Sequence, residues 1–328
     1  MGFYAILSLF AQSFAQFSQN RVKYKIINMS KILVVGSSNV DLTARVDHLP
    51  VPGETVTNAE FVQTLGGKGA NQAVAAARLG GEVTFATMLG HDAYAADLRN
   101  QFEKVGIDMS YVLDTAEAPT GTAFIFVSAK GENCIAVAPG ANAHLTPEKV
   151  QIFKDAIKET DIVVMQAEIP YETVCAVANE AAARGKKVLY NPAPACNVSE
   201  DLIKCITTMV LNEVEASEVS GIQYNGDNLD EIADSLIARG VETVIITLGG
   251  DGVYMKDSKT TLRIPSHKVK VVDTVAAGDT FCGALAAKGS IDKEALEFAN
   301  AAAAIAVTRH GAQSSIPTLE EVNNFLSK

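Results

Sequence analysis

The segment from Asp273 to Phe281 holds the residue types best suited to chemistry, in the order Asp-Thr-Val-Ala-Ala-Gly-Asp-Thr-Phe. The small residues Ala276, Ala277 and Gly278 precede a predicted helix, so backbone N–H groups can converge there on an anion. Asp279 falls in the first helical turn, where the helix dipole favours the ionised carboxylate. A carboxylate beside an anion site is the arrangement that deprotonates a hydroxyl attacking phosphorus. An acid that only stabilises its helix is the commoner alternative, but the Ala-Ala-Gly run favours catalysis.

A second glycine-rich segment, Gly66 to Gln72, reads Gly-Gly-Lys-Gly-Ala-Asn-Gln and opens an alanine-rich helical pattern. It is no Walker motif, which has four residues between its first glycine and the Gly-Lys pair and Ser or Thr after the lysine. Its glycines still let the backbone approach a ligand closely, and a helix N-terminus offers free N–H groups. A plain loop-to-helix turn is the alternative. Lysine and asparagine among the glycines favour a binding site formed by Gly67, Lys68, Gly69 and Asn71.

Polar side chains also follow predicted strands. Asn39 and Asp41 come after the first strand, and Glu168 comes after the strand 162–165. Ligands of α/β sheets bind at the carboxyl ends of the strands, and a carboxylate there can accept two sugar hydroxyls at once. The first loop lacks the G-x-G-x-x-G spacing, so a dinucleotide site is a weak interpretation. A turn closed by its own Asn and Asp side chains is the alternative.

Two further sequence patterns each fit either a binding site or an ordinary structural element. Asn212 and Glu215 are three residues apart at a helix start, where an amide and a carboxylate can share hydrated Mg²⁺ or phosphate. The same spacing describes a helix capping box, and the pattern favours neither. The segment 247–252 is a strand followed by a tight glycine turn, which is equally typical of a hairpin.

The elements that must position these residues alternate along the chain. Short β-branched runs predict strands at 32–35, 83–86, 162–165, 188–190, 208–211 and 244–247. Helical patterns lie at 70–79, 93–105, 147–159, 171–184, 213–220, 229–238, 278–288 and 293–308. Uniformly apolar strands separated by helices predict a doubly wound, mainly parallel sheet flanked by helices.

Two stretches break this rhythm. Residues 42–65 alternate polar and apolar side chains without a helix, and residues 122–137 are typical of a β-hairpin. Extra β-segments in an α/β domain usually form a lid or an oligomer surface. We therefore expect a small β-sheet lid built from about 40–65 and 120–138.

Composition limits the classes of partner. Of 328 residues, 48% are hydrophobic and 20% charged, and the net charge is −11. An acidic chain without Trp and with 6% aromatic residues argues against nucleic-acid and anionic-membrane partners. The five cysteines form no C-x-x-C pair and no zinc spacing, which predicts reduced thiols and a cytoplasmic location.

The N-terminal segment reads differently from the rest. Residues 3–17 are apolar and are followed by Arg21, Lys23 and Lys25, the reverse of the order in a signal peptide. The stretch is also too short and too interrupted to span a bilayer. We expect residues 1–28 to be a non-native or disordered extension and 29–328 to be a single α/β domain. An organellar transit segment is the alternative.

Together these motifs resemble the ribokinase-type family of sugar kinases. The resemblance runs from Lys31 to the C-terminus and rests on the segments 66–72, 191–195, 273–281 and 301–313. It implies that Asn39, Asp41, Gly67, Lys68, Gly69, Asn71 and Glu168 hold the sugar, and that Asp279 contacts it as the base. It further implies that the ATP site comprises Asn212, Glu215, Thr247, Leu248, Gly249, Gly250, Asp251, Gly252, Gly278 and Asn300.

The same resemblance implies cofactors and an assembly. Mg²⁺ would bridge the ATP phosphates, with Asn212 and Glu215 ordering its water shell. K⁺ would activate the enzyme from a site of mostly backbone carbonyls at Asp273, Val275, Ala306, Arg309, Gly311 and Ser315. Members of the family usually form homodimers through the β-lid.

The expected activity is ATP-dependent phosphorylation of D-ribose at its 5-hydroxyl. Kinases for 2-deoxyribose, another pentose or a nucleoside share most of these motifs, although Asn39 beside Asp41 favours a sugar with a 2-hydroxyl. A sugar-binding regulator without turnover is an alternative from another class. The presence of Asp279 and Ala-Ala-Gly argues against it, because a pure binder needs no base.

Overall fold

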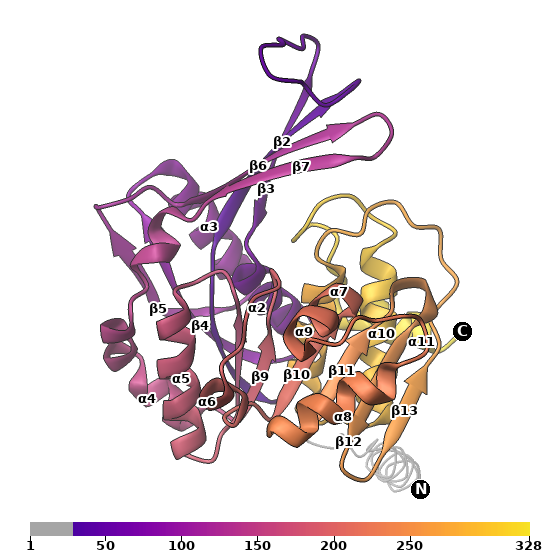
Figure 1. Ribbon diagram of the computed structural model, residues 1–328. Helices are drawn as coiled ribbons and strands as arrows, with labels where there is room; N and C mark the ends of the chain where they lie inside the picture. The colour runs from indigo at the N-terminus through magenta and orange to yellow at the C-terminus, as the bar shows by residue number, and fades with distance from the viewer. Residues whose placement is uncertain (1–28) are drawn as a thin grey trace, which may run out of the picture.

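The computed structural model describes residues 29–328, and the expectation for residues 1–28 lies outside this range. Two sheets organise these residues (Figure 1). A large sheet with helices on both faces forms the body, and a small sheet projects from it. In the described range no helix has the length and apolar character to cross a membrane.

The large sheet has nine strands in the order β13-β12-β11-β10-β9-β8-β1-β4-β5. Their bounds are β1 Lys31–Val35, β4 Glu82–Gly90, β5 Asp108–Thr115, β8 Ile162–Gln166, β9 Lys187–Asn191, β10 Thr208–Asn212, β11 Thr243–Thr247, β12 Val253–Asp257 and β13 Thr261–Ile264. Pairings from β11 through β5 are parallel, and β12 and β13 are added antiparallel. The mainly parallel, doubly wound sheet predicted from the apolar runs is confirmed.

Side-chain alternation along β1 shows how the sheet divides the core. Ile32 and Val34 belong to one buried cluster, and Leu33 and Val35 belong to the other. The first cluster lies under α2 (Lys68–Arg78), α3 (Ala93–Lys104), α9 (Ala277–Lys288), α10 (Lys293–Ala306) and α11 (Leu319–Leu326). The second lies under α4 (Lys154–Glu159), α5 (Tyr171–Ala183), α6 (Glu200–Ile203), α7 (Glu213–Ser220) and α8 (Leu229–Arg239). Both faces of the sheet are therefore covered, as fully apolar parallel strands require.

The structure corrects several expected elements. The helix expected at 147–159 is a 3₁₀ segment, η2 (Pro147–Ile152), followed by the short α4. The strands β5, β12 and β13 and the helix α11 were not predicted. β5 carries several partly or fully exposed side chains, since it lies at the sheet edge, so it lacks the continuous apolar run of a central strand.

The small sheet is built from both irregular stretches. Its strands are β2 (Asn39–Val46), β3 (Glu60–Gly66), β6 (Gly121–Ser128) and β7 (Asn133–Ala138), in the order β3-β2-β6-β7. The antiparallel β6–β7 pair confirms the predicted hairpin, and β2 pairs with β6 in parallel. Asn39 and Gly121 face each other at the root of this sheet, where it joins the body.

Candidate active site

A cavity of about 370 Å³ lies where the carboxyl ends of β8, β9 and β10 meet the root of the small sheet. We call it the sugar-side cavity. The charged and amide side chains that line it are Asn39, Asp41, Lys68, Asn71, Glu168, Asn191, Asn212, Glu215 and Asp279. The structure therefore brings together residues from Asn39 to Asp279, which the sequence singled out separately at strand ends and helix starts.

Close packing of two helices positions the Asp279 carboxylate. A Cβ atom on Gly283 of α9 would lie 2.5 Å from the Cβ of Ala75 of α2, so only glycine allows this approach. The N-terminal turns of α2 and α9 are thereby adjacent. Asn71 and Gln72 on α2 reach Asp279 on α9 across the contact.

Asp279 is held by two side-chain amides. Its Oδ2 accepts a hydrogen bond from Asn71 Nδ2 at 2.9 Å, and its Oδ1 accepts one from Gln72 Nε2 at 3.0 Å. Gln72 is oriented in turn, because its Oε1 accepts from Gln166 Nε2 at 2.7 Å. Each carboxylate oxygen keeps a second lone pair for a substrate hydroxyl. Gln72 belongs to the glycine-rich motif, but its role was missed, since only the fold shows that it faces Asp279.

Four carboxylates surround one ammonium group in this cavity. Burial, and after it the charges of Glu168 and Asp279, raise the pKa of Asp41 to about 7. Burial lowers the pKa of Lys68, but the negative charges of Asp279, Glu168 and Glu215 together raise it by more. The net shift of this pKa is upward, so Lys68 is charged. The cavity thus presents one fixed positive charge among groups that accept hydrogen bonds.

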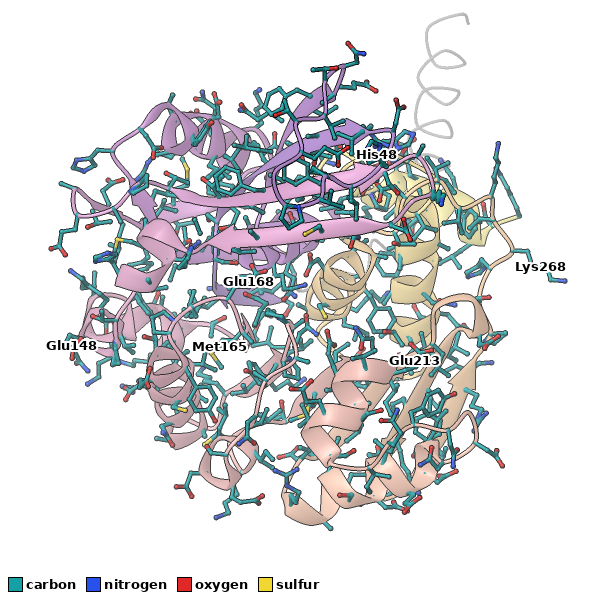
Figure 2. The ribbon with its side chains drawn as sticks, turned by 45° about the horizontal axis from the view of Figure 1, so that its top comes forward. His48, Glu148, Met165, Glu168, Glu213 and Lys268 are labelled. Atoms are coloured by element: carbon teal, nitrogen blue, oxygen red, sulfur yellow. The ribbon has the colours of Figure 1, made fainter. Side chains whose placement is uncertain are left out.

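Glu168 links the loop after β1 to the start of α2. Its Oε2 accepts hydrogen bonds from Ser37 Oγ at 2.5 Å and from the Lys68 backbone N–H at 2.9 Å. The residue lies beneath the strands of the small sheet (Figure 2). One oxygen of Glu168 therefore orders the walls of the cavity, and its other oxygen has no hydrogen bond to a residue in the range 29–328.

The segment predicted to bind an anion, Ala276 to Gly278, lies at the start of α9. Ala276 adopts a left-handed conformation with φ of 59°, and α9 begins at Ala277. The Ala277 N–H donates to the Thr274 carbonyl oxygen at 3.3 Å, so part of its capacity is used within the turn. Gly278, in the first turn of α9, has no intrahelical acceptor for its N–H by position.

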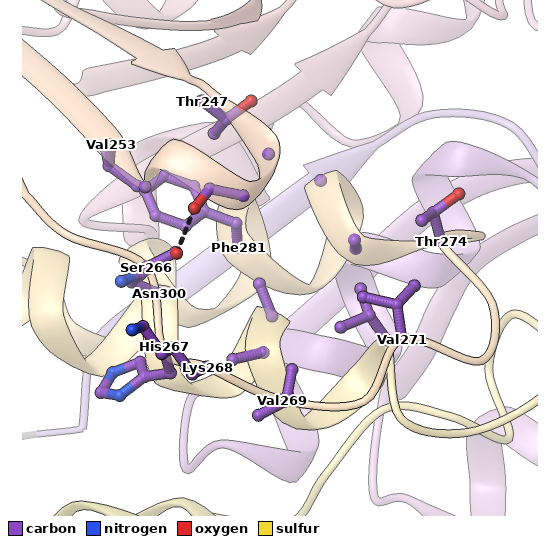
Figure 3. Close-up of a pocket in the computed structure, with 18 residues that line it drawn as sticks. Thr247, Val253, Ser266, His267, Lys268, Val269, Val271, Thr274, Phe281 and Asn300 are labelled. Carbon is purple, nitrogen blue, oxygen red and sulfur yellow. Dashed lines mark hydrogen bonds between the residues drawn. The ribbon is translucent and has the colours of Figure 1, made fainter.

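A second cavity of about 470 Å³ lies beyond this turn, and we call it the nucleotide-side cavity (Figure 3). Its walls are glycines and mostly apolar side chains: Thr247, Gly249, Gly250, Gly252, Val253, Val269, Val271, Phe281, Ala303, Ala304 and Val307. Ser266 Oγ donates to the Gly250 carbonyl oxygen, and Asn300 Nδ2 donates to the Pro265 carbonyl oxygen at 2.8 Å. Both cavities are lined by Thr247, Thr274, Ala277 and Gly278, so they meet at the start of α9.

The residues predicted for the nucleotide divide between the two cavities. Thr247, Gly249, Gly250, Gly252, Gly278 and Asn300 line the nucleotide-side cavity, whereas Asn212 and Glu215 line the sugar-side cavity. Leu248 and Asp251 line neither of them. Leu248 is buried in the core instead, and Asp251 is exposed. The apolar wall, which includes Phe281, carries no sequence signal that distinguishes it from ordinary core.

Asn212 and Glu215 form the capping box that the sequence left open. Asn212 Oδ1 accepts from the Glu215 N–H at 2.8 Å, and Glu215 Oε2 accepts from the Asn212 N–H at 2.9 Å. Burial raises the pKa of Glu215, and Asp279 raises it further, against the opposing effects of the Asn212 hydrogen bond and Lys68. The Glu215 side chain therefore both caps α7 and lines the cavity.

The turn predicted to hold a monovalent cation is organised by Asp273. Its Oδ1 accepts from the Val275 N–H at 3.0 Å and its Oδ2 from the Gly311 N–H at 3.1 Å, which joins the two predicted segments. The Arg309 side chain is directed to Glu321 at 2.6 Å, leaving only its backbone for a cation. The Ala306 carbonyl oxygen already accepts from the Arg309 N–H at 3.1 Å. In the range 29–328 no three His, Cys, Asp or Glu side chains gather as a metal-ligand set.

Comparison with known protein families identifies the class of protein. Residues 29–319 match the family described as "pfkB family carbohydrate kinase". The chain belongs to this family.

Within it, the chain is 42% identical over 300 residues to a ribokinase of Staphylococcus aureus, covering 90% of this chain and 99% of that protein. A deoxyribokinase of Salmonella typhi is 35% identical over 302 residues, covering 90% and 98%. Among solved structures, a Thermotoga maritima ribokinase aligns with a TM-score of 0.83 at 41% identity, covering 91% of this chain and 100% of the other. An Arabidopsis thaliana ribokinase complexed with ribose and ATP aligns with a TM-score of 0.85 at 29% identity, covering 91% and 99%.

Proposed function

We propose that this chain is an ATP-dependent kinase that transfers the γ-phosphoryl group to the 5-hydroxyl of D-ribose, yielding ribose 5-phosphate and ADP. The observation that carries the proposal is the meeting of two cavities at the start of α9, with Asp279 on the sugar side. A phosphoryl group transferred between the cavities passes the first-turn amides, where negative charge is stabilised. The Arabidopsis thaliana ribokinase complexed with ribose and ATP supports the assignment of one ligand to each cavity.

In this proposal the polar side chains of the sugar-side cavity bind ribose. The carboxylates of Asp41 and Glu168 accept hydrogen bonds from hydroxyls, and the Lys68 ammonium and the amides of Asn39 and Asn71 complete the set. Gly67 lines the cavity, whereas Gly69 does not line it and packs the start of α2 against the loop after β1, where a Cβ would lie 2.5 Å from the carbonyl carbon of Gly36.

Asp279 is the general base. Its two oxygens are fixed by Asn71 and Gln72, so a 5-hydroxyl that binds a free lone pair is aligned for proton transfer. The hydroxyl oxygen then attacks phosphorus, and the amides at Ala276–Gly278 stabilise the charge on the transferred group. The glycines of the 247–252 turn bring backbone close to the ATP phosphates.

Two metal ions belong to the proposal. Glu215 and Asn212 would order the water shell of Mg²⁺, which when bound neutralises phosphate charge. Backbone carbonyls at Val275, Ala306, Arg309 and Gly311, with Asp273 and Ser315, would hold K⁺. Carboxylate, carbonyl and hydroxyl oxygens suit both ions, because these are hard cations.

The small sheet is proposed to act as a lid and a dimer surface. Its face away from the sugar-side cavity carries Phe61, Phe124 and Phe126, which are 63%, 46% and 38% exposed. Clustered exposed aromatic residues of this kind mark protein–protein contacts. We further propose that residues 29–328 act as one domain, in the cytoplasm, as a homodimer joined through this face, with no nucleic-acid or membrane partner.

The test is a coupled assay of ADP release with ribose, 2-deoxyribose, fructose and adenosine as acceptors. We expect ribose to give the highest kcat/KM. A preference for 2-deoxyribose would favour the activity of the Salmonella relative instead. Ribose binding without ADP release would favour a regulator that lacks turnover.

A further inference from the structure

Asn142 is a buried amide behind the sugar-side cavity that the sequence did not single out. It lies in η1 (Gly140–His144), just after the β6–β7 hairpin, and is 1% exposed. It does not line the cavity itself. Its side chain contacts Ser38 in the loop after β1 and, directly, Asn39, the first residue of β2.

The chemistry of these contacts fixes the orientation of both amides. Asn142 Oδ1 accepts from the Ser38 backbone N–H at 2.9 Å, and a backbone N–H can only donate. Asn142 Nδ2 therefore faces the other way and donates to the Ser38 carbonyl oxygen at 3.2 Å. The same Nδ2 lies 2.7 Å from the side chain of Asn39, so the atom facing it must be the acceptor Oδ1.

The Nδ2 group of Asn39 is consequently turned away from Asn142. It donates to no side chain or backbone atom of residues 29–328, while Asn39 is 3% exposed and lines the sugar-side cavity. The neighbouring Gly121 keeps the contact close. A Cβ there would lie 2.2 Å from both Asn142 Nδ2 and Asn39 Oδ1.

We infer that Asn142 is a positioning residue for sugar binding, which holds Asn39 with its N–H donors toward a sugar hydroxyl and its oxygen away. This rests on the proposed function only in taking the ligand to be a sugar. Four carboxylates line the cavity, so a fixed donor at Asn39 complements acceptors such as Asp41 and Glu168. A hydroxyl can then accept from Asn39 and donate to a carboxylate.

The variant Asn142→Asp tests the orientation at nearly constant size. One carboxylate oxygen still accepts from the Ser38 N–H, but the other now faces Asn39 as an acceptor and turns that amide over. We expect KM for ribose to rise about tenfold, the equivalent of about 1.4 kcal/mol, a typical cost for losing one hydrogen bond. The value of kcat should stay within about twofold, since Asp279 is untouched.

A double-mutant cycle separates this role from a structural one. In Asn39→Ala the oriented amide is gone, so adding Asn142→Asp should leave the ribose KM unchanged relative to Asn39→Ala. Additive losses would show that Asn142 acts elsewhere and would overturn the inference. Turnover of ribose by the unmodified chain tests the proposed function separately.

Two variants guard against a folding artefact. Asn142→Ser removes the amide without adding a charge and should raise the ribose KM in the same way. Thr173→Val, the control, removes the hydrogen bond from Thr173 Oγ1 to the Leu145 carbonyl oxygen at 2.6 Å, next to η1. It should lower the melting temperature and leave the ribose KM unchanged. An unchanged ribose KM in folded Asn142→Ser or Asn142→Asp would overturn the inference.

Discussion

The two cavities that meet at α9 are built by different means. The sugar-side cavity is made of charged and amide side chains that hydrogen-bond one another, as in the chain Gln166–Gln72–Asp279. The nucleotide-side cavity is made mostly of glycine turns and apolar walls, although His267 and Lys268 also line it, and the Asn300 side chain there hydrogen-bonds the backbone of Pro265. In the proposed function, sugar recognition and proton transfer depend on side-chain identity in the first cavity, whereas nucleotide binding depends mainly on backbone geometry in the second.

The largest expected effect comes from removing the proposed base, Asp279, from the sugar-side cavity. Asp279→Asn keeps the size of the side chain but removes the proton acceptor, so kcat should fall by about 10²–10⁴-fold. Ribose and ADP should still bind, because the other lining groups are unchanged. Steady-state kinetics and calorimetric binding measure the two quantities.

The matched control is Asp292→Asn, another helix-start acid, which caps α10 by accepting from the Ala295 N–H at 2.9 Å. Its kcat should remain at the wild-type value. If Asp279→Asn keeps wild-type kcat, Asp279 is not the base.

A glycine substitution should disrupt the nucleotide-side cavity, whose shape depends on its backbone. Gly252 has φ of +97°, and a Cβ there would lie 2.0 Å from the Ile264 carbonyl oxygen. In Gly252→Ala the turn must shift, so ATP affinity should fall by about tenfold or more, equivalent to about 1.4 kcal/mol. Stability should fall by about 1–3 kcal/mol, while ribose affinity stays unchanged.

Gly226→Ala isolates the backbone cost, because Gly226 has a similar φ of +96° with open space around it. Denaturant unfolding and nucleotide titration compare the variants. Equal ATP affinity in both would mean that the 247–252 turn does not contact the nucleotide.

The residues of the sugar-side cavity were only partly predictable from the sequence. The sugar-side residues Lys68, Asn71 and Asp279 lie in glycine-rich motifs at helix starts, so local pattern found them. Gln72, Asn142 and Gln166 were missed, since their partners lie far away in sequence, as in the 94 residues between Gln166 and Gln72. The fold alone shows which amide faces which.

The elements divide in the same way. Central strands such as β8 were predicted from their apolar runs, because burial on both faces leaves a local signature. The antiparallel strands β12 and β13, at one end of the large sheet, were not predicted as strands. Their order in the sheet depends on tertiary packing. The hairpin that the sequence left open after Thr247 is present, because β11 and β12 pair antiparallel across the glycine turn.

A smaller effect, dependent on pH, should belong to the sugar-side cavity. Asp41 has a pKa raised to about 7 by burial and by Glu168 and Asp279, and its ionised form accepts sugar hydroxyls best. Below pH 7 kcat/KM for ribose should therefore fall, by up to about tenfold per pH unit, because this ratio reports the free enzyme. Asp41→Asn should lack this pH dependence, whereas Glu54→Gln, at a loop hydrogen bond, should retain it.

The raised pKa of Asp41 also sets the direction in which the free energy of unfolding changes with pH. The folded chain keeps a proton on Asp41 that the unfolded chain releases near its ordinary pKa of 3.8. The free energy of unfolding of the wild type, relative to Asp41→Asn, should therefore fall as pH rises from about 4 to about 7. A constant difference over this range would mean that the Asp41 carboxyl titrates normally.

The smallest expected effect concerns the turn organised by Asp273, which is built from backbone like the nucleotide side yet lies beside the first turn of α9. If its carbonyls hold K⁺, replacing K⁺ by Na⁺ should lower kcat severalfold, because the smaller ion fits a carbonyl ring differently. Asp273→Asn should weaken this response, since its side chain joins Val275 to Gly311. Titrating each salt at constant ionic strength separates cation binding from screening. Equal rates in both salts would contradict the cation site. The N-terminus of α9 would then be the remaining source of positive potential at the proposed anion site.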